Sequence, residues 1–312
     1  MKTYKINIIK VLILCLLCIS TGCSVNQSEI KTTENTNTEE TVVSDNENNF
    51  DSEAITPDNN NIQIDLSDYF QGIIGCAVIN NLNEGQYLIY NQELSEKRSS
   101  PCSTFKIIST IIGLESGVLE SKDTVIEWNG TQYFFDEWNQ DLTLEQAFQS
   151  SCVWYFRGVI DQAGEEKVKE VLTTLSYGNG DISQWTGSNT HSDYSELNGF
   201  WLESSLLISP REQVDTLFRI FEDETDIRED YIHILKEIMQ IDNSGNNSKV
   251  FGKTGTGYKD NACVDAWFVG IAENENHTYY YAIRLDEPTN DSVSGQKAKE
   301  IALNIINDYF SR

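Results

Sequence analysis

The sequence predicts an α+β fold, with one antiparallel sheet formed from both chain ends, helices on its faces and an inserted helical region. Near the start of the folded part, two β-rich runs joined by a polar turn predict a hairpin. Three further β-rich runs lie near the other end of the chain, and helical patterns fill the interval. Strands at both ends with helices between favour a single sheet covered by helices. The predicted strands are 73–80, 86–91, 250–256, 263–272 and 279–285.

The helical patterns follow one another between the two groups of strands. Pro101 precedes isoleucines and a leucine at spacings that suit an amphipathic or fully buried helix. Residues 181–200 are polar and contain glycine, which predicts a long loop, and long loops in compact domains are usually functional. The aromatic string 133–138 is not assigned to an element. The other predicted helices cover 142–148, 163–175, a segment that starts at 209–210, 230–241 and 296–309.

Length and charge limit the classes of protein that fit. The chain has 312 residues, 39% of them hydrophobic, so it can bury one substantial core or two small ones. A net charge of -27 argues against nucleic acid and anionic membrane surfaces as partners, and solubility is its simplest explanation. The sequence does not specify an oligomeric state.

The N-terminus predicts export. Residues 1–22 read as a signal peptide, because lysines precede a short apolar stretch at 11–19. The segment Ser20–Cys23 resembles a bacterial lipoprotein cleavage site, which implies lipidation of Cys23 and a lipoprotein on the extracellular face of the cytoplasmic membrane. Ser20 stands where leucine is usual, so plain cleavage or an uncleaved anchor are alternatives.

Two segments follow the signal peptide. Residues 23–62 are acidic, polar and nearly free of aromatic residues, which predicts a disordered tether. Residues 63–312 are the predicted catalytic domain. Its four cysteines show no C-x-x-C spacing, and the three histidines of the chain are scattered, so no metal site is expected. The sequence alone does not pair these cysteines as disulfides.

The segment Ser103-Thr104-Phe105-Lys106 has the composition of a nucleophile with its own base. On a helix, residues three apart share one face, so the hydroxyl of Ser103 and the amine of Lys106 can meet. Burial among apolar groups lowers the pKa of a lysine and lets its neutral amine take the serine proton. A capped helix with a solvated lysine is the alternative for this motif alone.

A second motif, Lys253-Thr254-Gly255-Thr256, ends an apolar run and predicts a strand edge that can pair with an amide-bearing substrate. Lys253 supplies a cation, Thr254 a hydroxyl and Gly255 room for a close approach. The N–H groups of Thr256 and Ser103 are the expected oxyanion donors. Alone, this motif also fits a turn beside a strand.

Five motifs together resemble the penicillin-recognising serine enzymes, and specifically the class D (oxacillinase-type) β-lactamases of Gram-positive type. The resemblance spans roughly residues 65–312 and implies the serine β-lactamase/transpeptidase-like fold, with β-lactam antibiotics as binding partners. The motifs that carry it occur in the order 103–106, 151–153, 177–179, 200–203 and 253–255.

The resemblance also implies catalytic roles. Ser103 is the acylated nucleophile, and Lys106, as N6-carboxylysine formed with CO2 or bicarbonate, is the general base. Ser151 relays a proton to the leaving nitrogen with support from Lys253. Trp201 hydrogen-bonds the carbamate. No other cofactor is implied.

The remaining site residues are implied as parts of the substrate pocket. Val153 and Leu202 form its walls. Tyr177 has a structural or substrate-side role, and simple packing fits it equally well. Many members hold the substrate carboxylate with an arginine near the last helix, which this chain lacks. The alternatives are Arg284, Lys297, or Thr254 with Thr256.

The expected function is hydrolysis of the β-lactam amide of penicillins and related antibiotics. Val153 argues against a cell-wall peptidase, because transpeptidases of this fold resemble S-x-N at that point and an apolar residue keeps Lys106 dry. The alternative is a β-lactam sensor or penicillin-binding protein, because residues 200–206 and the tail also resemble sensor domains that acylate but deacylate slowly.

Overall fold

The computed structural model describes residues 60–188, 192–222, 225–241, 248–259, 262–287 and 293–309. These residues belong to one compact unit, Thr56–Arg312. The predicted signal peptide, the lipidation site Cys23 and the tether up to residue 59 lie outside the described residues and stay predictions. Within the described ranges, no helix is long and apolar enough to cross a membrane.

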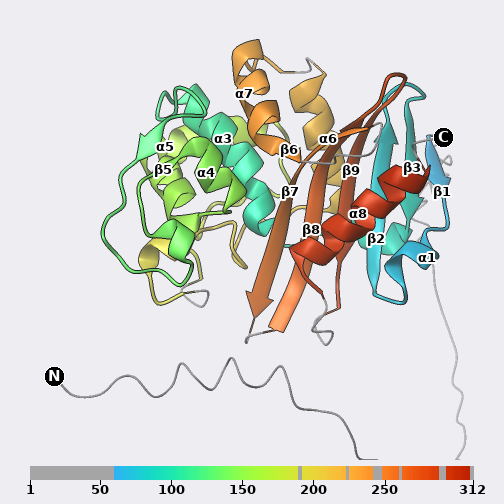
Figure 1. Cartoon of the computed structure of the whole chain (residues 1–312), viewed down its shortest axis with the longest axis horizontal. Helices are drawn as coiled ribbons and strands as arrows, with labels where there is room; N and C mark the ends of the chain where they lie inside the picture. Colours follow the sequence, from blue (N-terminus) through green and yellow to red (C-terminus); the bar gives the residue numbers. More distant parts are fainter. Residues whose placement is uncertain are drawn as a thin grey trace, which may run out of the picture. The chain divides into compact units, whose positions relative to one another are not determined.

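One seven-stranded sheet joins the two ends of the domain, which confirms the predicted fold class (Figure 1). Strand β2, from the start of the domain, pairs along its length with β9, from the end. All neighbours are antiparallel except β1, which runs parallel to β3. In sheet order, the strands are β1 (Asn61–Gln63), β3 (Gln86–Tyr90), β2 (Gly75–Asn81), β9 (Thr278–Leu285), β8 (Ala262–Glu273), β7 (Lys249–Lys259) and β6 (Gln240–Ile241).

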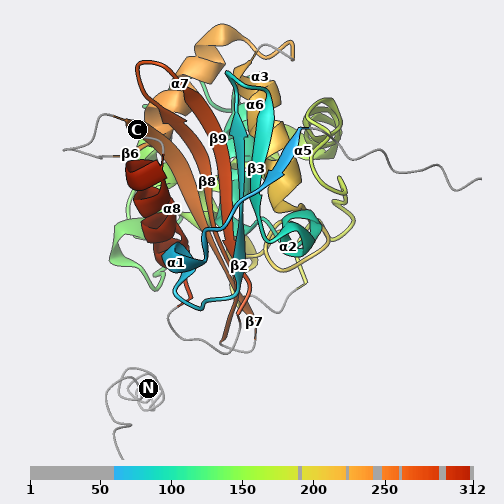
Figure 2. The same cartoon turned by 90° about the vertical axis from the view of Figure 1, so that its right-hand side faces the viewer.

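Helices cover both faces of the sheet (Figures 1 and 2). Alternate residues of a strand point to opposite faces, so Phe268 of β8 packs toward α8 while Trp267 packs toward the inserted helical region. Helices α1 (Ser67–Phe70) and α8 (Gly295–Tyr309) cover one face. Helices α2 (Gln92–Glu96) and α6 (Pro210–Phe221) lie on the other.

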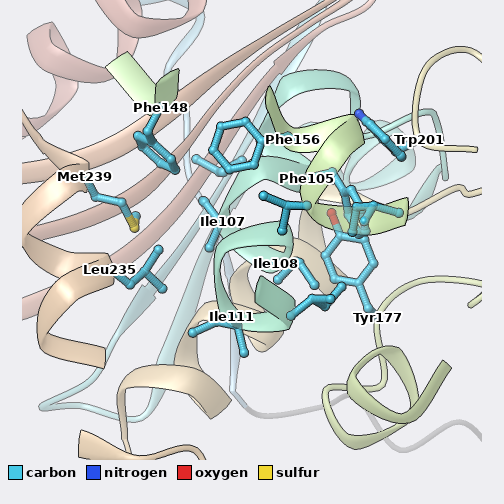
Figure 3. Packing of buried hydrophobic residues seen from close by; sticks show 14 of the residues in the cluster. Phe105, Ile107, Ile108, Ile111, Phe148, Phe156, Tyr177, Trp201, Leu235 and Met239 are labelled. Carbon is cyan, nitrogen blue, oxygen red and sulfur yellow. The ribbon is translucent and has the colours of Figure 1, made fainter. Parts of the chain in front are cut away.

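The inserted region is built around α3, whose nine residues from Lys106 to Leu114 are all buried. Figure 3 shows its isoleucines surrounded by side chains of neighbouring helices and loops. The nucleophile helix is therefore the hydrophobic centre of this region. Its other elements are η1 (Cys102–Phe105), β4 (Val125–Ile126), η2 (Asp136–Trp138), β5 (Leu142–Thr143), α4 (Leu144–Gln149), α5 (Val153–Thr174), η3 (Ser195–Leu197) and α7 (Glu229–Met239).

Several predicted boundaries were wrong for identifiable reasons. The helix predicted at 163–175 starts ten residues earlier, at Val153, because its first part is buried on almost all sides and shows no amphipathic period. Gly164 interrupts it with φ 80°. The segment predicted as a helix at 142–148 opens with the short strand β5. Strand β1 begins at Asn61, inside the predicted tether.

Candidate active site

The nucleophile turn differs from the predicted helix start. Cys102 has a left-handed backbone with φ 50°, so the chain enters a 3-10 helix before α3 begins at Lys106. Residues three apart are eclipsed in a 3-10 helix, which stacks Lys106 over Ser103. Nζ of Lys106 lies 2.8 Å from Oγ of Ser103. The predicted serine–lysine pair is therefore formed.

Burial lowers the pKa of the base, Lys106. The side chain of Lys106 is 0% exposed, and desolvation lowers the pKa of its amine from 10.5 to about 8. The ring of Phe156 lies 5.7 Å from Nζ and gives the charged form of the lysine a weak favourable contact. With this pKa, about a tenth of the amine is neutral at pH 7, far more than for a solvated lysine, and it is the neutral form that can be carboxylated.

The second serine–lysine pair joins the helical region to the sheet. Nζ of Lys253 donates to Oγ of Ser151 at 3.0 Å and to the carbonyl of Thr254 at 3.2 Å. Burial, together with the charges of Lys106 and Lys299, lowers the pKa of Lys253 well below its usual value. Because the Ser151 hydroxyl accepts from Lys253, its own proton is free to be donated into the cavity.

Ser151 is held in place by the end of α4. Its φ of 57° is left-handed. The Cys152 N–H bonds to the carbonyl of Ala147, and the Ser151 N–H bonds to the carbonyl of Phe148, which together form a Schellman cap. Glycine usually occupies this position, so a serine here carries backbone strain of the kind found at functional sites.

A cavity of about 410 Å³ opens over the nucleophile. The residues named from the sequence that line it are Ser103, Ser151, Val153, Leu202, Thr254 and Thr256. The pocket walls at Val153 and Leu202 are apolar and buried, which limits water near Lys106. The cavity is also lined by Phe134, Phe135, Glu137, Trp138, Ser150, Ser192, Leu197 and Tyr258.

Gly255 has a different role from the one expected. A Cβ at this position would lie 3.0 Å from Cγ2 of Thr104 and 3.1 Å from the carbonyl oxygen of Pro101. The close approach that glycine permits is therefore between β7 and the nucleophile turn. It sets Ser103 beside the edge of β7, where Thr254 and Thr256 border the cavity.

Trp201 lies next to the pair without lining the cavity. Its ring is 0% exposed and stacks on Phe105 at 5.5 Å between centroids. Its indole Nε1–H has no hydrogen-bond partner among the described residues. A buried unpaired donor is costly, so it points to a missing acceptor. The carbamate oxygen of a carboxylated Lys106 fits that chemistry.

Two predicted substrate residues are placed elsewhere. Arg284 on β9 is 2% exposed, its guanidinium donates to Oδ1 of Asp265 at 2.6 and 2.8 Å, and it does not line the cavity. Tyr177 is 1% exposed and packs against Phe105, which agrees with a packing role. Lys297 pairs with Glu300 at 2.8 Å. Of the alternatives predicted to bind the substrate carboxylate, Thr254 with Thr256 is the one that lines the cavity.

Some site residues were missed. Phe134, Phe135 and Tyr258 are exposed aromatic residues at the cavity, and the unassigned aromatic string was the signal for the first two. Lys299 of α8 lines an adjacent cavity of about 370 Å³, which it shares with Lys253 and Thr254. Within the described ranges, Lys299 makes no ion pair. Nothing in its sequence context distinguishes it from Lys297.

The described residues contain no cluster of His, Cys, Asp or Glu suited to a metal ion. Cys76, Cys102, Cys152 and Cys263 are free thiols.

Two serine–lysine pairs, Ser103 with Lys106 and Ser151 with Lys253, meet at one cavity, which both serines line. This arrangement defines a serine acyltransferase site, and comparison with known proteins agrees. The family model described as Penicillin binding protein transpeptidase domain matches residues 34–307, so the chain belongs to that family. The relatives that it matches include β-lactamases and the regulatory protein BlaR1.

Among these relatives, the regulatory protein BlaR1 of Bacillus licheniformis is 36% identical over 74% of this chain, which spans only 36% of that protein. YbxI of Bacillus subtilis, described as a probable beta-lactamase, is 33% identical over 79% of this chain and 85% of its own length. A class D β-lactamase from Bacillus subtilis has a similar structure, with TM-score 0.69, 33% identity and coverage of 80% and 96% of the two chains. The C-terminal domain of the Bacillus licheniformis BlaR penicillin receptor gives TM-score 0.70 at 33% identity, covering 80% and 97%.

Proposed function

We propose that this protein is a class D serine β-lactamase that hydrolyses penicillins and related antibiotics through an acyl-enzyme on Ser103. The observation that carries the proposal is the 2.8 Å contact between Oγ of Ser103 and Nζ of the fully buried Lys106. The test is steady-state hydrolysis of a chromogenic cephalosporin: many turnovers per chain support the proposal, and a single stoichiometric burst contradicts it.

In acylation, the carboxylate of carboxylated Lys106 takes the proton from Ser103 as Oγ attacks the β-lactam carbonyl carbon. The N–H groups of Ser103 and Thr256 are the proposed oxyanion donors. When the carbon–nitrogen bond breaks, the leaving nitrogen takes a proton from the hydroxyl of Ser151, and Lys253 restores that proton through the 3.0 Å contact. The result is an ester on Ser103 and a ring-opened amine.

Deacylation needs a base that activates water. Before substrate binds, the nitrogen of neutral Lys106 can attack the carbon of CO2: the N–C bond forms, one C=O bond of CO2 becomes C–O⁻, and the nitrogen releases one proton to the solvent. The product is a carbamate that supplies a carboxylate base at this position. The surroundings of Lys106 fit a carboxylated lysine. Lys106 is buried, Val153 and Leu202 exclude water, and Trp201 offers an unpaired N–H donor.

Trp201→Phe is expected to raise the bicarbonate concentration that half-saturates turnover, because the carboxylated lysine loses a buried donor. Leaving such an acceptor underbonded costs about 1–3 kcal/mol, so a shift of roughly tenfold is expected, with deacylation slowed more than acylation. Trp185→Phe is the matched control, since its Nε1 bonds to Asp161 instead. Equal bicarbonate dependence in all three chains would contradict the role of Trp201.

The substrate carboxylate is proposed to bind the hydroxyls of Thr254 and Thr256, with Lys299 as the nearby cation. Lys299→Ala is expected to raise KM for benzylpenicillin a few-fold with kcat little changed, since a partly exposed charge contributes only about 0.2–1 kcal/mol. Lys297→Ala, which removes a cation already paired with Glu300, is the control. A KM shift with Lys297→Ala and none with Lys299→Ala would reverse the assignment.

The second candidate function is a β-lactam sensor that acylates and then deacylates slowly. The similarity to the BlaR1 protein and to the solved receptor domain favours it. Both candidates use Ser103 as nucleophile. They differ in the lifetime of the acyl-enzyme, so that lifetime decides between them.

A further inference from the structure

Ser100 is a buried serine three residues before the nucleophile, and its side chain is 5% exposed. Its hydroxyl donates to the backbone carbonyl of Trp201 at 2.8 Å and accepts from the backbone N–H of Glu203 at 2.9 Å. Its carbonyl accepts from the indole Nε1 of Trp267 at 3.1 Å. One side chain therefore bonds the nucleophile turn to the backbone on both sides of Leu202.

Two further contacts join the same pair of turns. The N–H of Cys102 donates to the carbonyl of Trp201 at 3.0 Å, and the Cys102 thiol lies 3.3 Å from Oε1 of Glu203. Both residues have left-handed backbones, with φ 50° at Cys102 and φ 44° at Glu203. Such conformations persist where surrounding contacts enforce them, so each turn holds the other in its conformation.

The two turns carry the two groups that must meet. The Cys102 turn leads directly into Ser103 and Lys106. The other turn carries Trp201, whose buried indole N–H has no partner among the described residues. A hydrogen bond to a group on Lys106 requires the indole to stay within a few tenths of an ångström of its place. The backbone bonds of Ser100 fix that place, although Ser100 does not border the cavity.

We propose that Ser100 is a positioning residue for lysine carboxylation. Its hydroxyl bonds the Trp201 backbone to the nucleophile turn, so that the indole donor is aligned with Lys106. This inference rests on the proposed function. Ser100 acts on the carboxylation equilibrium through Trp201, and acylation by Ser103 in saturating bicarbonate depends on it much less.

The test is a double-mutant cycle in the full-length chain. The carbamate of Lys106 is titrated with ¹³C-labelled bicarbonate and followed by its NMR signal, which is independent of activity, while acylation is followed by intact mass. Ser100→Ala is expected to raise the half-saturating bicarbonate concentration about tenfold, as the loss of buried hydrogen bonds implies. In a Trp201→Phe background, the same substitution is expected to have little further effect, because interacting residues are non-additive.

Ser99→Ala is the matched control. The neighbouring Ser99 hydroxyl bonds to Oδ2 of Asp265 and not to the Trp201 turn, so its loss is expected to leave the carbamate titration unchanged. If Ser100→Ala does not give folded protein, Ser100→Cys, with a similar volume and a weak donor, takes its place in the cycle.

The possible outcomes separate the positioning role of Ser100 from the carboxylation of Lys106 itself. An unchanged titration in the Ser100 variant, or effects of Ser100 and Trp201 that multiply, overturns the positioning role while leaving the proposed function intact. A wild-type chain that shows no carbamate signal at any bicarbonate concentration contradicts the carboxylation of Lys106 itself, and this inference with it. A shifted titration that disappears without the indole supports the inference.

Discussion

Replacement of Ser103 by alanine is expected to abolish covalent labelling by benzylpenicillin and to lower turnover by several orders of magnitude. Ser103 supplies the only atom that becomes bonded to the substrate in the proposed mechanism, and removing a nucleophile usually has an effect of this size. The measurement is intact mass after incubation with benzylpenicillin, followed by the hydrolysis rate.

The matched control for this change is Ser116→Ala at the other end of α3, where the hydroxyl bonds to the carbonyl of Gly113 and is remote from the cavity. Labelling and turnover are expected to stay at wild-type levels in that variant. A penicillin adduct that persists at another serine in the Ser103 variant would contradict the assignment of the nucleophile.

Lys106→Met is expected to be comparably inactive while making the folded chain more stable. Methionine keeps much of the side-chain volume but has no amine, so neither acylation nor deacylation has its base. Stability is expected to rise because burial lowers the pKa of Lys106 from 10.5 to about 8, so that the charged lysine destabilises the fold at neutral pH. That shift corresponds to about 3 kcal/mol at most.

The pH dependence of this stability difference has a definite sign. The unfolded chain holds the lysine proton up to about pH 10.5, whereas the folded chain releases it near pH 8. The cost of burying Lys106 is therefore fully present below pH 8 and is relieved as pH rises from 8 to 10.5. Urea unfolding of both chains in bicarbonate-free buffer measures it, and a wild-type chain that is the more stable one at pH 7 would contradict the buried charge.

The serine–lysine pair could be predicted because it is local. Ser103 and Lys106 are three residues apart, and the isoleucines that bury the lysine follow directly in the sequence. Even here, the prediction missed the left-handed Cys102 and the 3-10 turn, which depend on contacts with residues about one hundred positions away. Local sequence specified the partners, and tertiary packing specified the backbone that aligns them.

Contacts between distant segments could be reached only through family resemblance. Ser151 and Lys253 are 102 residues apart, and nothing in their local patterns places them in contact. Arg284 shows the limit of a charge-based prediction, because an arginine near the site is equally consistent with substrate binding and with an internal ion pair. The register of β8 and β9 brings Asp265 close enough to bond it, and register was not predictable from the sequence.

The lifetime of the acyl-enzyme tests the proposed function most directly. The wild-type chain is mixed with a tenfold excess of benzylpenicillin in saturating bicarbonate, and intact mass and hydrolysed penicillin are followed together over time. A class D β-lactamase is expected to consume all of the penicillin, with the adduct on Ser103 present only while substrate remains. An adduct that persists after one equivalent of penicillin is consumed, with no further hydrolysis, would contradict the β-lactamase function and identify a sensor.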